Sequence, residues 1–269
     1  MIQTIGFIGA GNIAEAMISG LTKAGSKIQI RATNQTNQAR LEQLEQKYNI
    51  IAAQFDDLVT SSDVLIIAVK PKNVQEVLQK LKTFKVQDKL IISVAAGIPM
   101  KVFNKYLPGI AVIRVMPNTS TAVSHSMTGL VRGENVTQEQ VEVCEQIFSA
   151  VGHVLWIPEE KMNALIAMSG SGPAYFYLFT ECLIQAGVQL GLNEKEAEIL
   201  VRETLIGAGK MMSESGKSPG RLREEVTSPN GTTHAAISSF MEDNIAKIVL
   251  KAVQACTRRA KDMEGEYSD

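Results

Sequence analysis

The first 158 residues alternate between two kinds of segment. Short runs rich in β-branched and other apolar residues are TIGFIG, IQIRAT, DVLIIAV, LIISVA, AVIRVM and HVLWI. Longer amphipathic stretches, such as IAEAMISGLTKAG and NVQEVLQKLKTF, separate them. Strands that alternate with helices are typical of parallel βαβ units, and strands that are apolar throughout are typical of a sheet covered on both faces. The pattern therefore predicts an α/β fold with a doubly wound, mostly parallel sheet.

From about Glu159 the strand-like runs give way to long helical patterns. We expect helices over residues 173–190, 194–212 and 244–263, and Asn193 and Glu196 have the spacing of a capping box. These helices carry wide apolar faces within about 110 residues. Because such faces are an aggregation hazard when exposed, the sequence predicts an all-α C-terminal domain over residues 159–269 that self-associates.

The composition excludes several classes of protein. The 269 residues are 45% hydrophobic and carry a net charge of −1, without the basic stripe of a nucleic-acid-binding protein. The longest apolar runs fall far short of the ~18 residues of a membrane span, and no signal peptide precedes the first expected strand. Cys144, Cys182 and Cys256 lie far apart, which favours buried thiols in a reducing compartment. We therefore expect a cytoplasmic protein that binds neither nucleic acid nor membranes.

A glycine-rich loop follows the first expected strand. Gly9-Ala10-Gly11-Asn12-Ile13-Ala14 has the G-x-G-x-x-A form of the dinucleotide fingerprint. The first glycine permits the tight turn, the second lets the backbone approach a pyrophosphate, and the alanine allows close packing of helix on strand. The free N–H groups of the next helix then face the phosphate. The loop predicts that residues 1–158 form a dinucleotide-binding domain of the Rossmann type.

The end of the second expected strand indicates which dinucleotide binds. NAD-binding domains usually have an acid about 20 residues after the glycines, bonded to the ribose 2′-hydroxyl. Here no acid lies between Lys27 and Arg40, and Asn34 occupies the expected strand end. Arg31 or Arg40 could supply a positive charge for a 2′-phosphate, or be a solvated surface residue. The sequence therefore favours NADPH, with NADH as the alternative.

The expected hydride-transfer domain lacks the usual acid–base groups. No tyrosine is followed by a lysine four residues later, the three histidines are scattered, and no residues have metal-ligand spacing. Reduction of a ketone forms an alkoxide and needs a strong proton donor, whereas a protonated imine becomes a neutral amine and chiefly needs positioning. The sequence therefore favours reduction of a C=N bond without a metal.

A candidate pocket for a substrate carboxylate lies in EEVTSPNGTTHAAISSF, between two expected helices. Its segment SPNGTT, residues 228–233, contains helix breakers followed by two threonines at the start of a new helix. The hydroxyls of Ser228 and Thr232, with the N–H groups around Gly231, form a helix N-terminus suited to an anion. A structural alternative is that Thr233 only caps this helix.

With these segments the sequence resembles the pyrroline-5-carboxylate reductase family over essentially its whole length. The matching motifs are GFIGAGNIAEAM, AVKP, SVAAGI, RVMPNT, MSGSGPAYFY and EEVTSPNGTTHAAI. The resemblance implies a Rossmann domain, a helical domain that interlocks two subunits, and in some relatives rings of dimers. It also implies reduction of 1-pyrroline-5-carboxylate to L-proline by NAD(P)H, the last reaction of proline biosynthesis.

The resemblance also assigns the site residues. Thr233 is placed against the ring nitrogen as the catalytic residue, and Ser228, Gly231, Thr232 and Thr233 contact the substrate. Ser169 and Ser171 lie in a loop that is either near the site or a plain helix start. The expected cofactor contacts, including the second strand end, are Ile8, Gly9, Ala10, Gly11, Asn12, Ile13, Asn34, Gln35, Ala68, Val69, Lys70, Pro71, Val94, Ala95 and Ala96.

Two alternatives to the reduction of 1-pyrroline-5-carboxylate remain open. The same pocket could accept another small cyclic imino acid, because one methylene changes binding by only ~1–3 kcal/mol. A non-catalytic, dinucleotide-binding regulatory protein is the other, although the hydroxyls of SPNGTT that such a protein could lose are all present. Many relatives have arginine at the position of Gln35, so its absence lowers the expected preference for NADPH.

Overall fold

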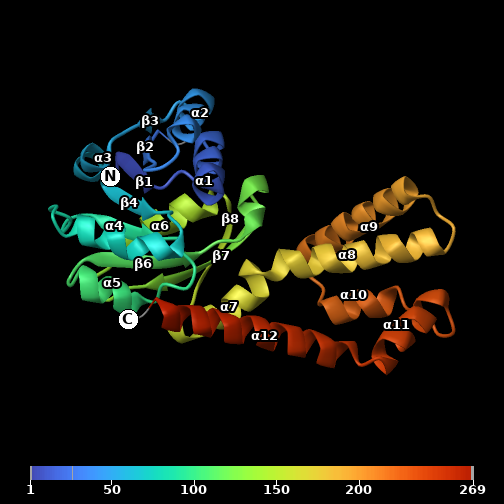
Figure 1. Cartoon of the computed structure of the whole chain (residues 1–269). Coiled ribbons are helices and arrows are strands. Elements are labelled where there is room, and N and C mark those ends of the chain that lie inside the picture. The colour runs from blue at the N-terminus through green and yellow to red at the C-terminus, as the bar shows by residue number, and fades with distance from the viewer. Residues whose placement is uncertain (1, 26, 268–269) are drawn as a thin grey trace. The chain divides into compact units, whose positions relative to one another are not determined.

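An eight-stranded sheet forms the first part of the computed structural model, which describes residues 2–25 and 27–267 (Figure 1). The strand order is β3-β2-β1-β4-β5-β6-β7-β8. Neighbouring strands are parallel except for β6 and β7, which are antiparallel. The strands are β1 (Thr4–Ile8), β2 (Gln29–Thr33), β3 (Ile51–Ala52), β4 (Val64–Ile67), β5 (Leu90–Ser93), β6 (Ala111–Met116), β7 (Ser126–Arg132) and β8 (Gly152–Trp156).

The order from β3 to β6 is that of a doubly wound dinucleotide-binding sheet, so the predicted fold class is confirmed. All six expected runs form strands, namely β1, β2, β4, β5, β6 and β8. The sequence pattern missed β3, which has two residues, and β7, which contains Ser126, Thr128 and Gly129 in place of an apolar run.

Helices cover both faces of the sheet (Figure 1). Ile66 of β4 belongs to a core shared with Met17 and Phe148, whereas its neighbour Ile67 belongs to a second core shared with Phe103. Alternate residues of one strand therefore enter opposite cores, which explains why the strands are apolar throughout. The first core lies against α1 (Asn12–Lys23), α2 (Gln38–Tyr48) and α6 (Gln138–Ser149), and the second against α3 (Phe55–Ser61), α4 (Val74–Leu81) and α5 (Met100–Tyr106).

The chain divides into two compact units. The sheet unit runs up to Ser171 and resumes at Cys256, and the helical unit is Gly172–Ala255. The segment after Glu159 is helical, with η3 (Glu159–Lys161), α7 (Met162–Leu165) and a π-turn, η4 (Ile166–Gly170), but its Met162 and Ala167 are fully buried in the sheet unit. The domain boundary at 158/159 that the sequence pattern predicts therefore stays a prediction.

A buried ion-pair cluster ties the end of α12 (Ile245–Glu266) to the sheet. Arg114 of β6 is 2% exposed, and its guanidinium donates to the Oε1 atoms of Glu159 at 2.9 Å and Glu264 at 2.8 Å. Asn163 donates to the second carboxylate oxygen of Glu264 at 2.8 Å. Because both carboxylates face one buried guanidinium, the returning segment is an integral part of the sheet unit.

The helical unit confirms the three long helices that the sequence predicts. They are α8 (Gly172–Gln189), α9 (Glu194–Glu214) and α12, joined through α10 (Pro219–Glu225) and α11 (Thr232–Glu242). The capping box at the start of α9 is present, because Asn193 accepts from the N–H of Glu196 and the Glu196 carboxylate accepts in return, both at 3.0 Å. Local sequence signals are therefore sufficient to start this helix.

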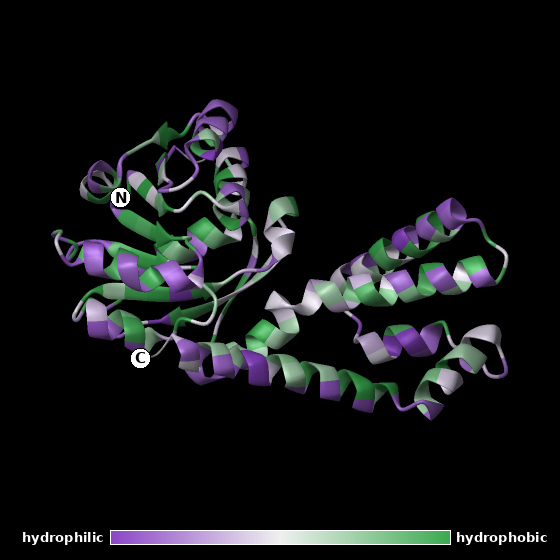
Figure 2. Cartoon of the chain, in the orientation of Figure 1, coloured by the Kyte–Doolittle hydropathy of each residue, from purple (hydrophilic) through white to green (hydrophobic). Residues whose placement is uncertain are grey.

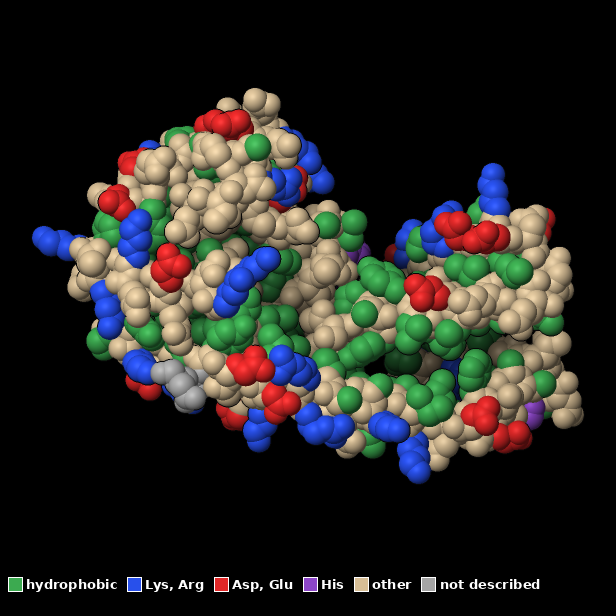
Figure 3. Space-filling view, viewed as in Figure 1, with side chains coloured by type: hydrophobic (Ala, Val, Ile, Leu, Met, Phe, Trp, Pro, Cys, Tyr) green, Lys and Arg blue, Asp and Glu red, His purple; other side chains and the backbone are tan. Residues whose placement is uncertain are grey.

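The helical unit has almost no core of its own. Among the described residues, Ala197 is the one hydrophobic residue of this unit that is buried. Most of the large exposed hydrophobic side chains of the chain lie here, including Leu178, Leu200 and Leu250 at 54–61% exposure. Figure 2 shows hydrophobic residues along α8 and the first half of α12, and Figure 3 shows apolar side chains on the surface of this unit. Such a surface is typical of an interface between subunits.

The structure shows the exposure of the three cysteines and the lengths of the apolar helices. All three cysteines are free; Cys144 is buried and Cys256 is partly buried. The expectation of buried thiols is wrong for Cys182, which lies exposed on α8 because none of the described residues covers it. None of the helices in the described part of the chain is long and apolar enough to cross a membrane.

Candidate active site

The glycine loop lies where the ends of three strands meet. Gly9 has φ of +105°, and a Cβ added to it would lie 2.6 Å from the carbonyl oxygen of Ala68. Its N–H donates to the carbonyl of Thr33 at 3.0 Å, so the turn also joins the end of β2. A side chain is therefore excluded at this position by both the backbone conformation and the neighbouring strand.

The second glycine of the loop leaves an open approach to the start of α1. Gly11 is the N-cap of α1, no side chain caps the helix, and no atom lies within 4 Å of a Cβ added at this position. The first helical hydrogen bond runs from Glu15 N–H to Gly11 carbonyl at 2.9 Å. The N–H groups of Asn12, Ile13 and Ala14 therefore have no helical acceptor, as an anion site requires.

Three expected cofactor segments meet at one edge of the sheet. Because β1, β4 and β5 are adjacent and parallel, their carboxyl ends carry residues 8–13, 68–71 and 94–96 to the same rim. The N–H of Ala68 donates to the Ile8 carbonyl at 2.8 Å, and that of Val94 to the Ile67 carbonyl at 3.1 Å. Lys70 is exposed, and Pro71 begins the short turn η1 (Pro71–Asn73) before α4. Ligands of open α/β sheets bind at this rim.

A cleft of about 460 Å³ lies beside Gly9 at the end of β2. Asn34 and Gln35 line it from one side and Val69 from another. Arg31 and Arg40, the two cations considered for a 2′-phosphate, do not line it. Residues from α3, η1 and α4 complete the lining, including Phe55, Asn73, Glu76, Val77 and Lys80.

Both arginines are engaged in ion pairs elsewhere. Arg31 donates to a carboxylate oxygen of Asp57 at 2.7 Å, and Arg40 pairs with Glu15. Burial raises the pKa of the Glu15 carboxyl, but hydrogen bonds from Lys47, Arg40 and Tyr48 outweigh that effect and hold the pKa below its ordinary value. Glu15 therefore fixes α2 against α1, the helix that follows the glycine loop.

A larger cleft, of about 890 Å³, lies at the other edge of the sheet. Arg132 at the end of β7 and Trp156 at the end of β8 line it. Because β7 runs antiparallel to β6, these ends lie opposite the rim that carries the glycine loop. None of the expected site residues lines this cleft, so its size does not make it the candidate site.

The segment SPNGTT forms a turn between α10 and α11. Asn230 has φ of +61°, and the N–H of Gly231 donates to the Ser228 carbonyl at 3.0 Å. A Cβ added to Gly231 would lie 2.6 Å from the Ser228 hydroxyl oxygen. Helix α11 begins at Thr232, as the sequence predicts, and Thr233 is its partly buried second residue.

The N-terminus of α11 is not capped by a side chain. Gly231 is the N-cap and makes no side-chain hydrogen bond, and the first helical bond runs from Ala235 N–H to Gly231 carbonyl at 3.1 Å. Three N–H groups, from Thr232 to His234, therefore lack helical acceptors. This geometry argues against the alternative in which Thr233 only caps the helix.

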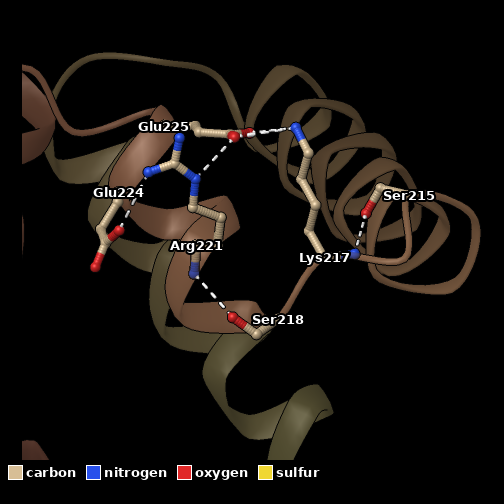
Figure 4. A network of polar contacts seen from close by, with 6 residues as sticks. All are labelled: Ser215, Lys217, Ser218, Arg221, Glu224 and Glu225. Carbon is tan, nitrogen blue, oxygen red and sulfur yellow. Dashed lines mark hydrogen bonds and ion pairs between the residues drawn. The ribbon is translucent and has the colours of Figure 1, made fainter.

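A network of charged residues joins α10, the helix before this turn, to the segment that precedes it (Figure 4). Glu225 accepts from Lys217 Nζ at 2.8 Å and from Arg221 Nε at 3.1 Å. The Ser218 hydroxyl caps α10 by accepting from the Arg221 N–H at 3.3 Å. Glu224 and Glu225 open the motif EEVTSPNGTT, so the network gives this acidic pair the role of fixing the helix that leads into the turn.

The serine-rich loop before α8 makes hydrogen bonds within the sheet unit. The Ser169 hydroxyl donates to the Met127 carbonyl at 2.8 Å, and the Asn118 amide donates to the Ser169 carbonyl at 3.3 Å. The Ser171 hydroxyl accepts from the Cys256 thiol at 3.3 Å, where the chain leaves and re-enters the sheet unit. Both serines therefore have hydrogen-bond partners within the sheet unit, and their place near the site stays a prediction.

Curated relatives match the chain over nearly its full length. The pyrroline-5-carboxylate reductase of Methanosarcina acetivorans is 38% identical over 97% of this chain and 98% of its own. That of Pisum sativum is 36% identical over 97% of this chain and 96% of its own. The chain belongs to the pyrroline-5-carboxylate reductase family. The family resemblance of the sequence motifs is thereby confirmed.

Family models and solved structures agree with this assignment. A model of pyrroline-5-carboxylate reductase dimerisation matches residues 159–263, and one of NADP oxidoreductases that are coenzyme F420-dependent matches residues 4–97. The pyrroline-5-carboxylate reductase of Coxiella burnetii superposes with a TM-score of 0.91 at 36% identity, covering 96% of this chain and 97% of its own. The pyrroline carboxylate reductase of Plasmodium falciparum, solved with NADP bound, has a TM-score of 0.84 at 27% identity, covering 98% of each chain.

Sequence reasoning missed three residues around the candidate site. The Asn118 amide donates to the Ser169 carbonyl across 51 residues of sequence, a contact that no local pattern reveals. Glu225 was not singled out, although its position in the EEVTSPNGTT motif could have drawn attention to it. Glu76 lines the cleft at the end of β2 from α4, and no local signal in the sequence marks it.

Proposed function

We propose that this protein reduces 1-pyrroline-5-carboxylate to L-proline with a hydride from NAD(P)H. Its likeness to reductases of that name over nearly the whole chain carries the proposal. The uncapped N-terminus of α11 beside the hydroxyls of SPNGTT supports it independently, because the substrate pairs a carboxylate with an imine. The combination fits a cyclic imino acid better than a simple ketone or aldehyde.

The glycine loop fits the pyrophosphate of the dinucleotide. The open space above Gly11 and the free N–H groups of α1 accommodate a phosphate, and Gly9 permits the tight turn that places them. Residues 68–71 and 94–96 are assigned to the nicotinamide half at the same rim, and Asn34 and Gln35 to the ribose. When bound, the cofactor supplies the hydride, and the protein supplies its position.

The substrate is assigned to the turn before α11. The N–H groups at the start of α11, with the hydroxyls of Ser228 and Thr232, bind the carboxylate. The hydroxyl of Thr233 is assigned to the ring nitrogen. As hydride reaches the carbon of the protonated C=N bond, the π electrons become the nitrogen lone pair, and the amine formed is neutral. Thr233 therefore holds the nitrogen in place without moving a proton.

The two alternatives are tested in the same assay. We expect NADPH oxidation when synthetic 1-pyrroline-5-carboxylate is added, and a lower kcat/KM with its six-membered homologue. A higher kcat/KM for the homologue would identify a different cyclic imino acid as the substrate. No oxidation with either compound, despite measurable cofactor binding, would favour the regulatory alternative.

The cofactor preference is proposed to favour NADPH. The reason is the missing acid at the end of β2, between Lys27 and Arg40. One charge-assisted contact to a 2′-phosphate contributes roughly 1.5–3 kcal/mol, or about one to two decades in kcat/KM. Because Gln35 replaces an arginine, and Arg31 and Arg40 are both ion-paired, we expect the lower end of this range. A higher kcat/KM with NADH would contradict the proposal.

Self-association is supported by the dimerisation model over residues 159–263. We propose an obligate homodimer formed by the helical unit, and a ring of dimers as the larger assembly. The exposed apolar residues of that unit support a dimer, since its one buried hydrophobic residue among those described is Ala197. Light scattering that shows a stable and active monomer would refute it. A cytoplasmic location is also proposed, consistent with three free cysteines.

A further inference from the structure

The ribose end of the cofactor cleft contains an acid that the fingerprint sequence does not show. Glu76 lies in the first turn of α4 and lines the cleft together with Asn34, Gln35 and Thr36 from the end of β2. Its carboxylate accepts a hydrogen bond from the Gln35 amide at 3.4 Å. The strand end that normally carries the ribose acid is therefore neutral, while a carboxylate reaches the same cleft from another element.

The positive charge in this cleft is already engaged. Of the described residues that line the cleft, Glu76 and Lys80 are the charged ones. The Lys80 ammonium lies 4.1 Å from the ring centroid of Phe55 and 3.4 Å from a carboxylate oxygen of Asp56. A 2′-phosphate with about two negative charges would meet an acid here and no uncommitted cation.

We propose that Glu76 sets the cofactor specificity of this reductase. The carboxylate accepts a hydrogen bond from the ribose hydroxyls of NADH and repels the 2′-phosphate of NADPH, so it makes NADH a usable cofactor. This inference rests on the proposed use of NAD(P)H and limits the preference for NADPH that the neutral strand end alone would give. Specificity then comes from a repulsive contact as much as from an attractive one.

The test compares Glu76→Gln with a matched control. Glu139→Gln removes an exposed carboxylate from the first turn of α6, so it has the same charge change and the same place in a helix, but Glu139 does not line the cleft. Titration calorimetry with adenosine 2′,5′-bisphosphate and with adenosine 5′-monophosphate measures binding without the nicotinamide. Steady-state kinetics with NADPH and NADH follow on the same proteins.

Glu76→Gln is expected to raise the affinity for the bisphosphate about tenfold relative to the monophosphate. The kcat/KM ratio of NADPH to NADH should rise by a similar factor, and Glu139→Gln should change neither ratio. Glu76→Asp keeps the charge and should stay close to the unmodified protein. Because Glu76 is exposed, the tenfold shift should shrink in about 0.5 M salt.

Three results would overturn the assignment of Glu76: an unchanged bisphosphate-to-monophosphate ratio, an equal shift in Glu139→Gln, or a shift that high salt leaves intact. These results are distinct from a failure of the proposed reaction. A protein that reduces 1-pyrroline-5-carboxylate but shows no shift contradicts only the role of Glu76. A protein with the shift but without that activity contradicts only the proposed reaction.

Discussion

Replacing Thr233 with valine separates a catalytic role from a structural one. Valine keeps the shape of the side chain and removes the hydroxyl. Loss of an N-cap would cost about 1 kcal/mol of stability, but Gly231 is the N-cap of α11 and no side-chain hydrogen bond is present there. We therefore expect the unfolding temperature of Thr233→Val to stay close to that of the unmodified protein.

The catalytic effect of the same change is expected to be large. A hydrogen bond that tightens on the ring nitrogen in the transition state is worth about 10² in kcat, as for other transition-state donors. This factor corresponds to about 2.7 kcal/mol in the activation barrier. Stopped-flow or steady-state NADPH oxidation with 1-pyrroline-5-carboxylate measures it, and Thr233→Ser should retain much of the activity.

Ser239→Ala is a matched control on the same helix. It removes an exposed hydroxyl from α11 six residues after Thr233, outside the segments assigned to the cofactor and the substrate, and should leave kcat unchanged. The reasoning fails if Thr233→Val is folded and has normal kcat. It also fails if the variant loses stability in proportion to its activity, because the hydroxyl would then support the helix and not the reaction.

Four further substitutions test the framework around the site. Gly9→Ala should cost about 1–3 kcal/mol of stability, measured by urea unfolding, because φ is +105° there, whereas Gly11→Ala should spare stability and weaken NADP⁺ binding in calorimetry. Arg114→Met should cost about 3 kcal/mol in urea unfolding, since it removes the buried guanidinium that pairs with Glu159 and Glu264. Glu15→Gln should destabilise the protein at pH 7 but not in acid: the folded pKa of Glu15 is lowered, so its contribution is present above the ordinary value of 4.5 and is lost as the pH falls through the folded pKa. Equal destabilisation of Glu15→Gln at pH 7 and pH ~3 would contradict the last expectation.

Most of the sheet could be predicted because its strands are marked locally. A strand buried on both faces is a continuous apolar run, and six such runs became strands. β7 was not predicted because it lacks a continuous apolar run. Its polar residues Ser126 and Thr128 are buried and hydrogen-bond to each other at 3.1 Å, which no local pattern reveals. Its antiparallel direction relative to β6 is set by how the strands pair in the sheet, and the residues of β7 alone do not indicate it.

The division of the chain was harder to predict than its secondary structure. The helical pattern after Glu159 is real, yet Met162 is buried in the core of the sheet unit. Helical periodicity reports that a face is apolar but not which domain covers it. The same limit applied to Cys182, which lies on an apolar helix but is exposed in the part of the chain that the structure describes.

The candidate site, like the domain division, could be predicted only where its residues are close together in the sequence. The glycine loop and the start of α11 were placed correctly because turn formers and helix starts act within a few residues. The meeting of Gln35 with Glu76 spans 41 residues and depends on how α4 crosses the end of β2. Local pattern therefore located the two uncapped helix N-termini that are assigned to the phosphate and the carboxylate, whereas the charge in the cleft at the end of β2 required the assembled sheet.

The return of α12 to the sheet has a consequence for synthesis on the ribosome. The buried guanidinium of Arg114 belongs to β6, but its partner Glu264 is translated 150 residues later, after the whole helical unit. Domains generally fold as units in the order in which they emerge. Until residues 256–266 are translated, the Arg114 guanidinium lacks the carboxylate of Glu264. A chain stalled before residue 256 is therefore expected to have a less stable β6 that proteases and chaperones can reach.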